Sequence, residues 1–166
     1  MELLLGCGRS RDKKVVLPGK EHWTILVTLD MNPDVDPDVV FSLDSIPLPF
    51  KDSIFDEIHA YEVLEHVGKQ GDWKFFFNQF DDFARILKPG GIVCITSPTQ
   101  DKTPGWVWGD PGHTRYMGKE VYTFLSRKEY ATQVGKTAMT DYRAYFISDW
   151  ETLHNQGGVF ILRNLK

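Results

Sequence analysis

Cysteine is scarce in this sequence of 166 residues, which contains only Cys7 and Cys94. Two cysteines beside short apolar stretches do not form the framework of an extracellular disulfide-stabilised domain. Long apolar runs are also missing, because no stretch approaches the roughly 18 apolar residues of a membrane span. The first residues lack the basic segment and apolar core of a secretory signal. We therefore expect a protein of the reducing cytoplasm that does not use a membrane.

An excess of basic residues is absent as well. The formal net charge is −4, from 19 Lys and Arg against 23 Asp and Glu. Residues 1–110 carry 11 basic and 18 acidic side chains, or −7, and residues 111–166 carry 8 and 5, or +3. The acidic first part disfavours general nucleic-acid binding, and a solvated surface explains the mildly basic remainder. We therefore do not expect a nucleic acid as partner.

The composition that is present indicates one globular domain. Hydrophobic residues make up 42% and charged residues 25%, which are ordinary values for a soluble fold. A chain of this length can bury a real core but is short for two domains. We therefore predict a single domain over residues 1–166.

The first ten residues, MELLLGCGRS, contain the feature around which the chain is organised. The leucines predict a short buried strand, and Gly6-Cys7-Gly8 predicts a tight turn at its end. In an open α/β sheet, ligands bind beyond the carboxyl ends of the central strands. This turn is therefore the first candidate for a ligand site.

Apolar runs predict further buried strands at residues 25–29, 39–41, 54–61 and 92–96. An apolar stripe with steps of three and four predicts a helix over residues 73–87, which we expect Lys88-Pro89-Gly90-Gly91 to end. Between the first two strands, residues 9–24 contain a β-branched pair and Pro18-Gly19, so we expect no crossover helix there.

The last third of the sequence begins with a long irregular segment at residues 97–118. Helices are predicted at 119–125 and at 126–135, the second with a capping box formed by Ser126 and Glu129. Residues 141–148 and 159–165 are predicted to form an antiparallel pair, with a helical turn at 150–154 before the glycine-containing connection.

No metal site is expected. The spacing of Asp34, Asp36 and Asp38 resembles the start of a calcium loop. Val39 and Ser45, however, occupy the positions of the required glycine and bidentate glutamate.

Five short motifs resemble the class I S-adenosylmethionine-dependent methyltransferases, in particular a short branch with Asp-x-x-x-Leu-Pro-Phe and Leu-Glu-His motifs. They are LLLGCG at 3–8, LVTLD at 26–30, DSIPLPFKDSIFD at 44–56, VLEHV at 63–67 and ILKPGG at 86–91. The resemblance implies an α/β fold with a Rossmann-like, doubly wound mixed sheet. It also implies mostly parallel strands, an antiparallel C-terminal hairpin and S-adenosylmethionine as cofactor. The chain departs from the family in its reduced N-terminal helices, because residues 9–24 replace the helix between the first two strands and no helix is predicted before the first strand.

The resemblance implies cofactor contacts at the ends of the first four strands. The glycine turn would approach the methionyl part, Asp30 would accept hydrogen bonds from the ribose, and Asp44 would lie near the adenine amino group. The implied residues are Gly6, Cys7, Gly8, Asp30, Met31, Asp44, Tyr61 and Glu62. Simple structural roles stay open: a tight turn for the glycines, an Asx turn for Asp30 and a cap for Asp44.

The glycine-rich residues 106–116 follow the fifth strand, where the resemblance places acceptor-binding elements. We predict substrate binding by aromatic stacking and an anion-binding arginine, with a general base if the acceptor is a hydroxyl. The substrate-binding candidates are Trp106, Trp108, Arg115 and Tyr116, and the catalytic candidates are His113 and Asp110. The alternative is an ordered loop docked on the sheet by its tryptophans. We interpret Glu65-His66 as a pair that orients the loop.

These observations predict methyl transfer to a small-molecule or sugar-like acceptor. Ala60-Tyr61-Glu62 lacks the motif of amino-methylating nucleic-acid enzymes. The reduced helices leave two alternatives: a non-catalytic binding or accessory protein, and a homo-oligomer in which a second chain covers the exposed face. A nicotinamide oxidoreductase is disfavoured, because Arg11 occupies the third glycine position of its motif.

Overall fold

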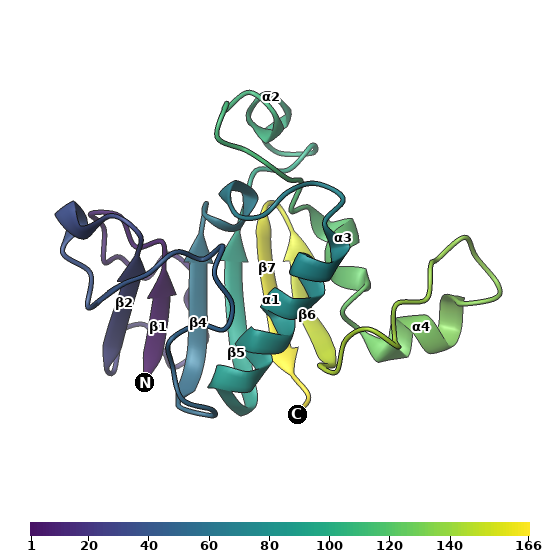
Figure 1. Ribbon diagram of the computed structural model, residues 1–166, viewed down its shortest axis with the longest axis horizontal. Helices are drawn as coiled ribbons and strands as arrows, with labels where there is room; N and C mark the ends of the chain where they lie inside the picture. Colours follow the sequence, from purple (N-terminus) through teal and green to yellow (C-terminus); the bar gives the residue numbers. More distant parts are fainter.

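A single mixed β-sheet of seven strands forms the centre of the computed structural model, which describes all 166 residues. The strand order is β3-β2-β1-β4-β5-β7-β6 (Figure 1). The strands are β1 (Glu2–Leu5), β2 (Leu26–Asp30), β3 (Val39–Val40), β4 (Phe55–Tyr61), β5 (Leu87–Thr96), β6 (Trp150–Gln156) and β7 (Val159–Asn164). The first five pair in parallel, whereas β7 is antiparallel to β5 and β6. The predicted Rossmann-like fold is confirmed.

The parallel strands end together along one edge of the sheet. Leu5 lies beside Leu29 in β2 and Ala60 in β4, and Tyr61 lies beside Thr96 in β5. Their continuous apolar sequences suit strands that are covered on both faces. The loops that follow β1, β2, β4 and β5 therefore meet at this carboxyl edge, at the top of Figure 1.

Helices cover one face of the sheet, where α1 crosses in front of the central strands in Figure 1. The helical segments are η1 (Pro33–Val35), η2 (Leu64–His66), α1 (Trp73–Ile86), α2 (Pro104–Val107), α3 (Lys119–Thr123) and α4 (Arg127–Gln133). The Asp72 carboxylate caps α1 by accepting from the Phe75 N–H at 3.0 Å, and Phe77, Phe80 and Phe83 enter the main core. No helix is long and apolar enough to cross a membrane.

The opposite face carries residues 9–24 in place of a crossover helix, as expected. Successive side chains of a strand point to opposite faces. Leu3 and Leu5 accordingly enter the core beneath α1, whereas Leu4 joins a second, smaller core with Val15 and Tyr61. The N-terminal part of the chain therefore covers this second face without helical structure.

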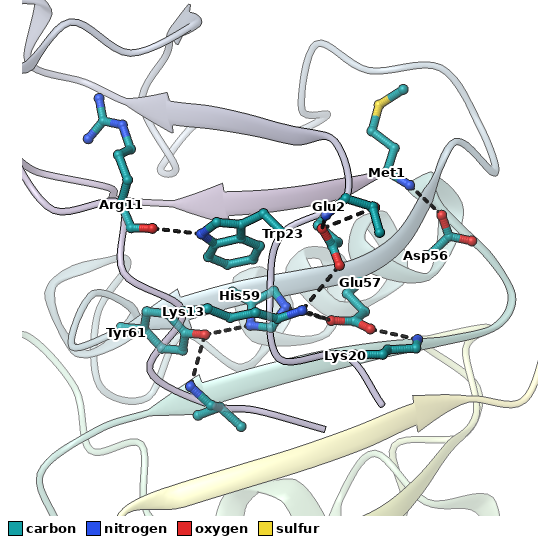
Figure 2. A network of polar contacts seen from close by, with 12 residues as sticks. Met1, Glu2, Arg11, Lys13, Lys20, Trp23, Asp56, Glu57, His59 and Tyr61 are labelled. Carbon is teal, nitrogen blue, oxygen red and sulfur yellow. Dashed lines mark hydrogen bonds and ion pairs between the residues drawn. The ribbon is translucent and has the colours of Figure 1, made fainter. Parts of the chain in front are cut away.

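A buried polar network holds residues 9–24 in place (Figure 2). The Lys13 ammonium pairs with Glu2 and with Glu57, each at 3.1 Å, and these three side chains are at most 4% exposed. Lys20 pairs with the second oxygen of Glu57 at 2.6 Å. The Trp23 indole N–H donates to the Arg11 carbonyl at 2.6 Å. Ion pairs and hydrogen bonds here supply the attachment that an apolar helix face supplies elsewhere.

Three side chains of β4 continue this network along the strand. The Val15 N–H donates to the Tyr61 hydroxyl at 3.2 Å. A neutral His59 whose Nε2 donates to a carboxylate has an unprotonated Nδ1, so the Tyr61 hydroxyl donates to this Nδ1 at 2.6 Å. His59 Nε2 then donates to Glu57 at 2.9 Å, which suits a neutral ring because burial lowers the pKa of His59. The network therefore has a defined direction of proton donation from Val15 to Glu57.

Two local details differ from the predictions. Helix α1 ends at Ile86, close to the predicted stop, but β5 begins at the buried Leu87, which pairs with Phe55, and not at residue 92. Residues 126–135 contain α4, but Ser126 makes no side-chain capping bond. Instead, Asp149 accepts from the Arg127 N–H at 2.8 Å, a cap supplied from a distant part of the chain.

The C-terminal hairpin is confirmed, but its first strand lies at Trp150–Gln156, where a helical turn was expected. Residues 141–148 form no strand, because their aromatic side chains pack against α1. The Phe146 ring stacks on Phe77 with centroids 4.5 Å apart, and Tyr142 lies beside Trp73 at 5.2 Å. Aromatic enrichment in this segment therefore indicates packing on the helix rather than strand pairing.

Candidate functional site

The glycine bend, residues 6–8, begins the candidate site at the carboxyl end of β1. Gly6 and Gly8 have φ angles of +56° and +51°, which favour glycine. A Cβ atom on Gly6 would overlap the Val63 side chain, whereas a Cβ on Gly8 would meet nothing within 4 Å. Packing therefore requires the first glycine, and the second leaves open space beside the backbone that a ligand can occupy.

Asp30, at the end of β2, lies directly against this bend. The Gly8 N–H donates to Asp30 Oδ2 at 2.9 Å, and the Asn32 N–H donates to Oδ1 at 2.9 Å. The second contact is the Asx turn considered as an alternative, so Asp30 serves the turn and also faces the bend. Each carboxylate oxygen has a second lone pair that can accept from a ligand hydroxyl.

Three more of the implied cofactor residues lie open to solvent nearby. Met31 is 70% exposed, and Glu62 is exposed with a φ of +53°. Asp44 is exposed and accepts from the Gly68 N–H through Oδ1 at 2.8 Å. An adenosine-containing cofactor fits these residues, because an open glycine backbone, a positioned carboxylate and an exposed apolar side chain follow one another along the edge.

Two of the implied cofactor residues have side chains that point elsewhere. Cys7 is buried in the second core, and its N–H donates to the Leu29 carbonyl at 3.3 Å. The Tyr61 hydroxyl belongs to the buried network with Val15 and His59, and burial raises the pKa of this phenol. Both side chains therefore complete the packing beneath residues 9–24, and the cofactor contacts of Cys7 and Tyr61 stay a prediction.

Arg115, the predicted anion-binding residue, lies inside the protein. Its side chain is 4% exposed, donates to the Leu64 carbonyl at 2.8 Å and donates to Gln79 Oε1 at 2.6 Å. Burial lowers the pKa of this guanidinium to about 10. Arg115 therefore joins η2 to α1 inside the protein.

The loop that carries Trp106 and Trp108 does not dock through them. These side chains are 64% and 54% exposed, whereas Val107 between them is buried. A cavity of about 350 Å³ lies between this loop and the ends of β4 and β5, lined in part by Glu62, Ser97 and Trp106. The exposed Trp106 therefore borders a space that can receive an acceptor.

Tyr116, the last of the substrate-binding candidates, makes two contacts within the protein. Its hydroxyl donates to Glu120 at 3.1 Å, and its N–H donates to the side chain of Gln70 at 2.8 Å. A larger cavity, about 580 Å³, lies away from all these residues, between the loop before β4 and the end of α1. Cavity size alone therefore does not locate the candidate site.

His113 and Asp110 lie close to each other, and His113 also lies beside His66. His113 Nε2 is 4.0 Å from Asp110 Oδ2, and the rings of His113 and His66 have centroids 4.6 Å apart. His66 bonds the Gly112 carbonyl at 3.1 Å, which agrees with a loop-orienting role. Sequence reasoning missed that Glu65, His66 and His113 come together. A signal existed, since Glu65-His66 and His113 follow neighbouring parallel strands.

The chain is similar in sequence to a known protein family and to a methyltransferase. Residues 3–95 match the model of a family described as a methyltransferase domain. The chain is 28% identical over 118 residues to 27-O-demethylrifamycin SV methyltransferase of Amycolatopsis mediterranei strain S699. That match covers 70% of this chain and 41% of the relative, so the chain spans about two fifths of that protein.

Solved structures with this fold include three methyltransferases. An S-adenosylmethionine-dependent methyltransferase from Archaeoglobus fulgidus has a TM-score of 0.60 at 16% identity, with 99% of this chain and 85% of that chain covered. The N-methyltransferase NodS from Bradyrhizobium japonicum WM9, in complex with S-adenosylhomocysteine, gives 0.56 at 17%, covering 99% and 78%. A putative methyltransferase of Haloferax volcanii, in complex with the activator Trm112, gives 0.54 at 18%, covering 98% and 80%.

Proposed function

Because the chain belongs to the family of methyltransferase domains, we propose that it uses S-adenosylmethionine to methylate a small-molecule or sugar-like acceptor. The observation that carries this proposal is the hydrogen bond of 2.9 Å from the Gly8 N–H to Asp30. It places a carboxylate beside an open glycine bend at the carboxyl edge of a parallel sheet, where nucleoside cofactors bind in such folds.

Each residue around the bend has a separate task in this proposal. Gly8 leaves room for the methionyl part, and Asp30 accepts from the ribose hydroxyls through its free lone pairs. Met31 covers the adenine, Asp44 accepts from its amino group, and Glu62 borders the crevice at the end of β4. The cofactor supplies an electrophilic methyl group on a sulfonium sulfur.

The loop of Trp106 and Trp108 covers the acceptor in this proposal. Closure of the exposed indoles over the cavity of about 350 Å³ would exclude water and align the acceptor. Such orientation can supply about 7–11 kcal/mol of the barrier reduction. The name of the relative from Amycolatopsis mediterranei specifies an oxygen of a small molecule, which supports an oxygen acceptor. Asp110 and His113 are the candidate bases.

Calorimetric titration with S-adenosylmethionine, S-adenosylhomocysteine and NAD tests the cofactor. We expect both sulfur compounds to bind and NAD not to bind. Asp30→Asn should weaken their binding about tenfold or more, because hydrogen bonds to a charged group are worth about 1.5–3 kcal/mol. Asp34→Asn, the same change at an exposed position in η1, should leave affinity unchanged.

Two results would contradict the proposal. One is tight NAD binding without recognition of either sulfur compound. The other is equal affinity of wild type and Asp30→Asn for S-adenosylhomocysteine, because the carboxylate beside the glycine bend would then make no contact with the cofactor.

A further inference from the structure

We propose that Glu65, His66 and His113 form a binding site for a divalent first-row transition-metal ion. One carboxylate oxygen of Glu65 and one ring nitrogen of each histidine lie within 4.8 Å of one another. Two imidazole nitrogens and a carboxylate oxygen form a donor set that suits Zn²⁺, Fe²⁺ and similar ions better than Mg²⁺ or Ca²⁺.

Both imidazole rings are held in the orientation that a metal ligand needs. His66 Nδ1 lies 3.1 Å from the Gly112 carbonyl, and His113 Nδ1 lies 3.0 Å from the Val107 carbonyl. Because a carbonyl oxygen only accepts, each Nδ1 carries the proton and each Nε2 keeps its lone pair. Metal-binding histidines are typically fixed by such a bond from the other ring nitrogen.

The third ligand is a buried carboxylate in which one oxygen has no hydrogen-bond partner. Glu65 is 2% exposed, and its Oε2 accepts from the Ser97 hydroxyl at 2.7 Å. Its Oε1 is buried without a hydrogen-bond partner. An unpaired buried acceptor destabilises the protein, and a charged one destabilises it more. A cation between Glu65 and the two histidines would remove this destabilisation.

Backbone hydrogen bonds fix the two segments that supply the ligands. The N–H groups of Thr114 and Arg115 donate to the Glu65 carbonyl at 2.9 and 3.3 Å. The Gln70 N–H donates to the Thr114 carbonyl at 2.9 Å. His113 is therefore held beside η2 by the main chain, so the cluster does not depend on the placement of flexible side chains alone.

Only a small adjustment separates this arrangement from metal coordination. Two ligand atoms that are each about 2.1 Å from an ion lie at most about 4.2 Å apart. In tetrahedral coordination the separation is about 3.4 Å, so atoms that now lie within 4.8 Å of one another need to approach by at most about 1.4 Å. His66 is exposed, which gives an ion a path from solvent and leaves coordination positions open.

The open coordination positions of the ion point to an acceptor that carries a hydroxyl group. This extension of the proposal rests on the proposed methyl transfer. Ser97, which holds Glu65, also lines the cavity beside Trp106. A metal ion lowers the pKa of an oxygen ligand. His113, once bound to the ion, could no longer act as a base, so the acceptor oxygen would lose its proton to Asp110 and form a bond to the methyl carbon. The carbon–sulfur bond breaks in the same step, and its electron pair stays on the sulfur.

The experiment is titration of the metal-free full chain with Co²⁺, Zn²⁺ and Mg²⁺, followed by calorimetry and by the Co²⁺ absorption spectrum. We expect one Co²⁺ or Zn²⁺ per chain and much weaker Mg²⁺ binding. His66→Ala, His113→Ala and Glu65→Gln should each weaken Co²⁺ binding at least tenfold. His154→Ala, which removes an exposed histidine outside the cluster, is the matched control and should bind like wild type.

Absence of stoichiometric Co²⁺ binding overturns the proposal, as does a His66→Ala variant that binds as tightly as wild type. Because His66 is exposed, the His66→Ala variant tests the metal site even if Glu65→Gln does not fold. The measurement needs no cofactor. A chain that binds Co²⁺ but no S-adenosylhomocysteine refutes the proposed function alone, and the opposite result refutes the metal site alone.

The acceptor class has its own readout in the Co²⁺-loaded protein. Catechol, used as an oxygen-donor probe, should shift the Co²⁺ absorption spectrum while the ion stays bound. Benzylamine at the same concentration should leave the spectrum unchanged. A spectrum that catechol does not alter overturns the role of the ion in binding a hydroxyl-bearing acceptor.

Discussion

At the scale of single residues, the two glycines of the bend are required for different reasons. Both have positive φ angles, but only Gly6 faces a side chain, that of Val63. Gly8 has open space where a side chain would lie. Gly6 therefore serves the packing of β1 against the loop after β4, whereas Gly8 keeps the ligand side of the bend free.

Gly6→Ala should lower the free energy of unfolding by about 2–5 kcal/mol. A left-handed conformation costs a non-glycine residue about 1–2 kcal/mol, and the overlap with Val63 adds about 1–3 kcal/mol of overpacking. Gly8→Ala is the matched control and should lose only the first of these. Urea denaturation followed by circular dichroism measures both. Equal losses in the two variants would show that the contact with Val63 has no energetic effect.

At the scale of elements, residues 9–24 occupy the place of a crossover helix and depend on charge instead of an apolar stripe. Lys13 lies between Glu2 and Glu57, and Lys20 completes the pairing of Glu57. Removing one partner from a buried ion cluster leaves an uncompensated charge, which costs more than the ion pair itself contributes. The attachment of this segment is therefore sensitive to a single substitution.

Lys13→Met should destabilise the protein by about 3 kcal/mol, because it leaves the Glu2 and Glu57 carboxylates without their shared partner. Lys14→Met makes the same change one residue further on. Lys14 is exposed and lies over the Tyr61 ring at 5.7 Å, a contact worth less than about 1 kcal/mol. Thermal unfolding measures both variants. If Lys14→Met were as unstable as Lys13→Met, the buried ion cluster would not explain the loss of stability.

The same network affects the whole molecule through its response to acid. Burial by itself raises the pKa of Glu57, but hydrogen bonds from His59, Lys20 and Lys13 outweigh it and lower the pKa from 4.5 to about 2. A carboxyl group with a depressed pKa in the folded state stabilises the fold above its unfolded pKa. That stabilisation is lost as the pH falls through the folded value.

The free energy of unfolding should therefore decrease between about pH 4.5 and pH 2, with at most about 3 kcal/mol of the decrease due to Glu57. Urea denaturation at a series of pH values measures this decrease. Glu57→Gln should be less stable than wild type at neutral pH and should show a smaller decrease over this range. An unchanged slope in that variant would assign the acid sensitivity to other carboxylates.

Local sequence patterns alone predicted the five parallel strands, the helix α1, the missing crossover helix and the position of the glycine bend before Asp30. These features are local, because runs of apolar residues, a helical period and glycine or proline each act within a few positions. The family resemblance was likewise carried by short motifs. The homo-oligomer, in which a second chain covers the face left exposed by the reduced helices, stays a prediction.

Which side chains face the site depends on the packing of segments that are distant in the sequence. Tyr61 and Arg115 were expected in the crevice but are bonded inside the protein, and residues 141–148 pack on α1 rather than pairing as a strand. The cluster of Glu65 and His113 depends on contacts between segments 49 residues apart in the sequence. The partner of a side chain is set by the packing of distant segments, which local patterns do not specify.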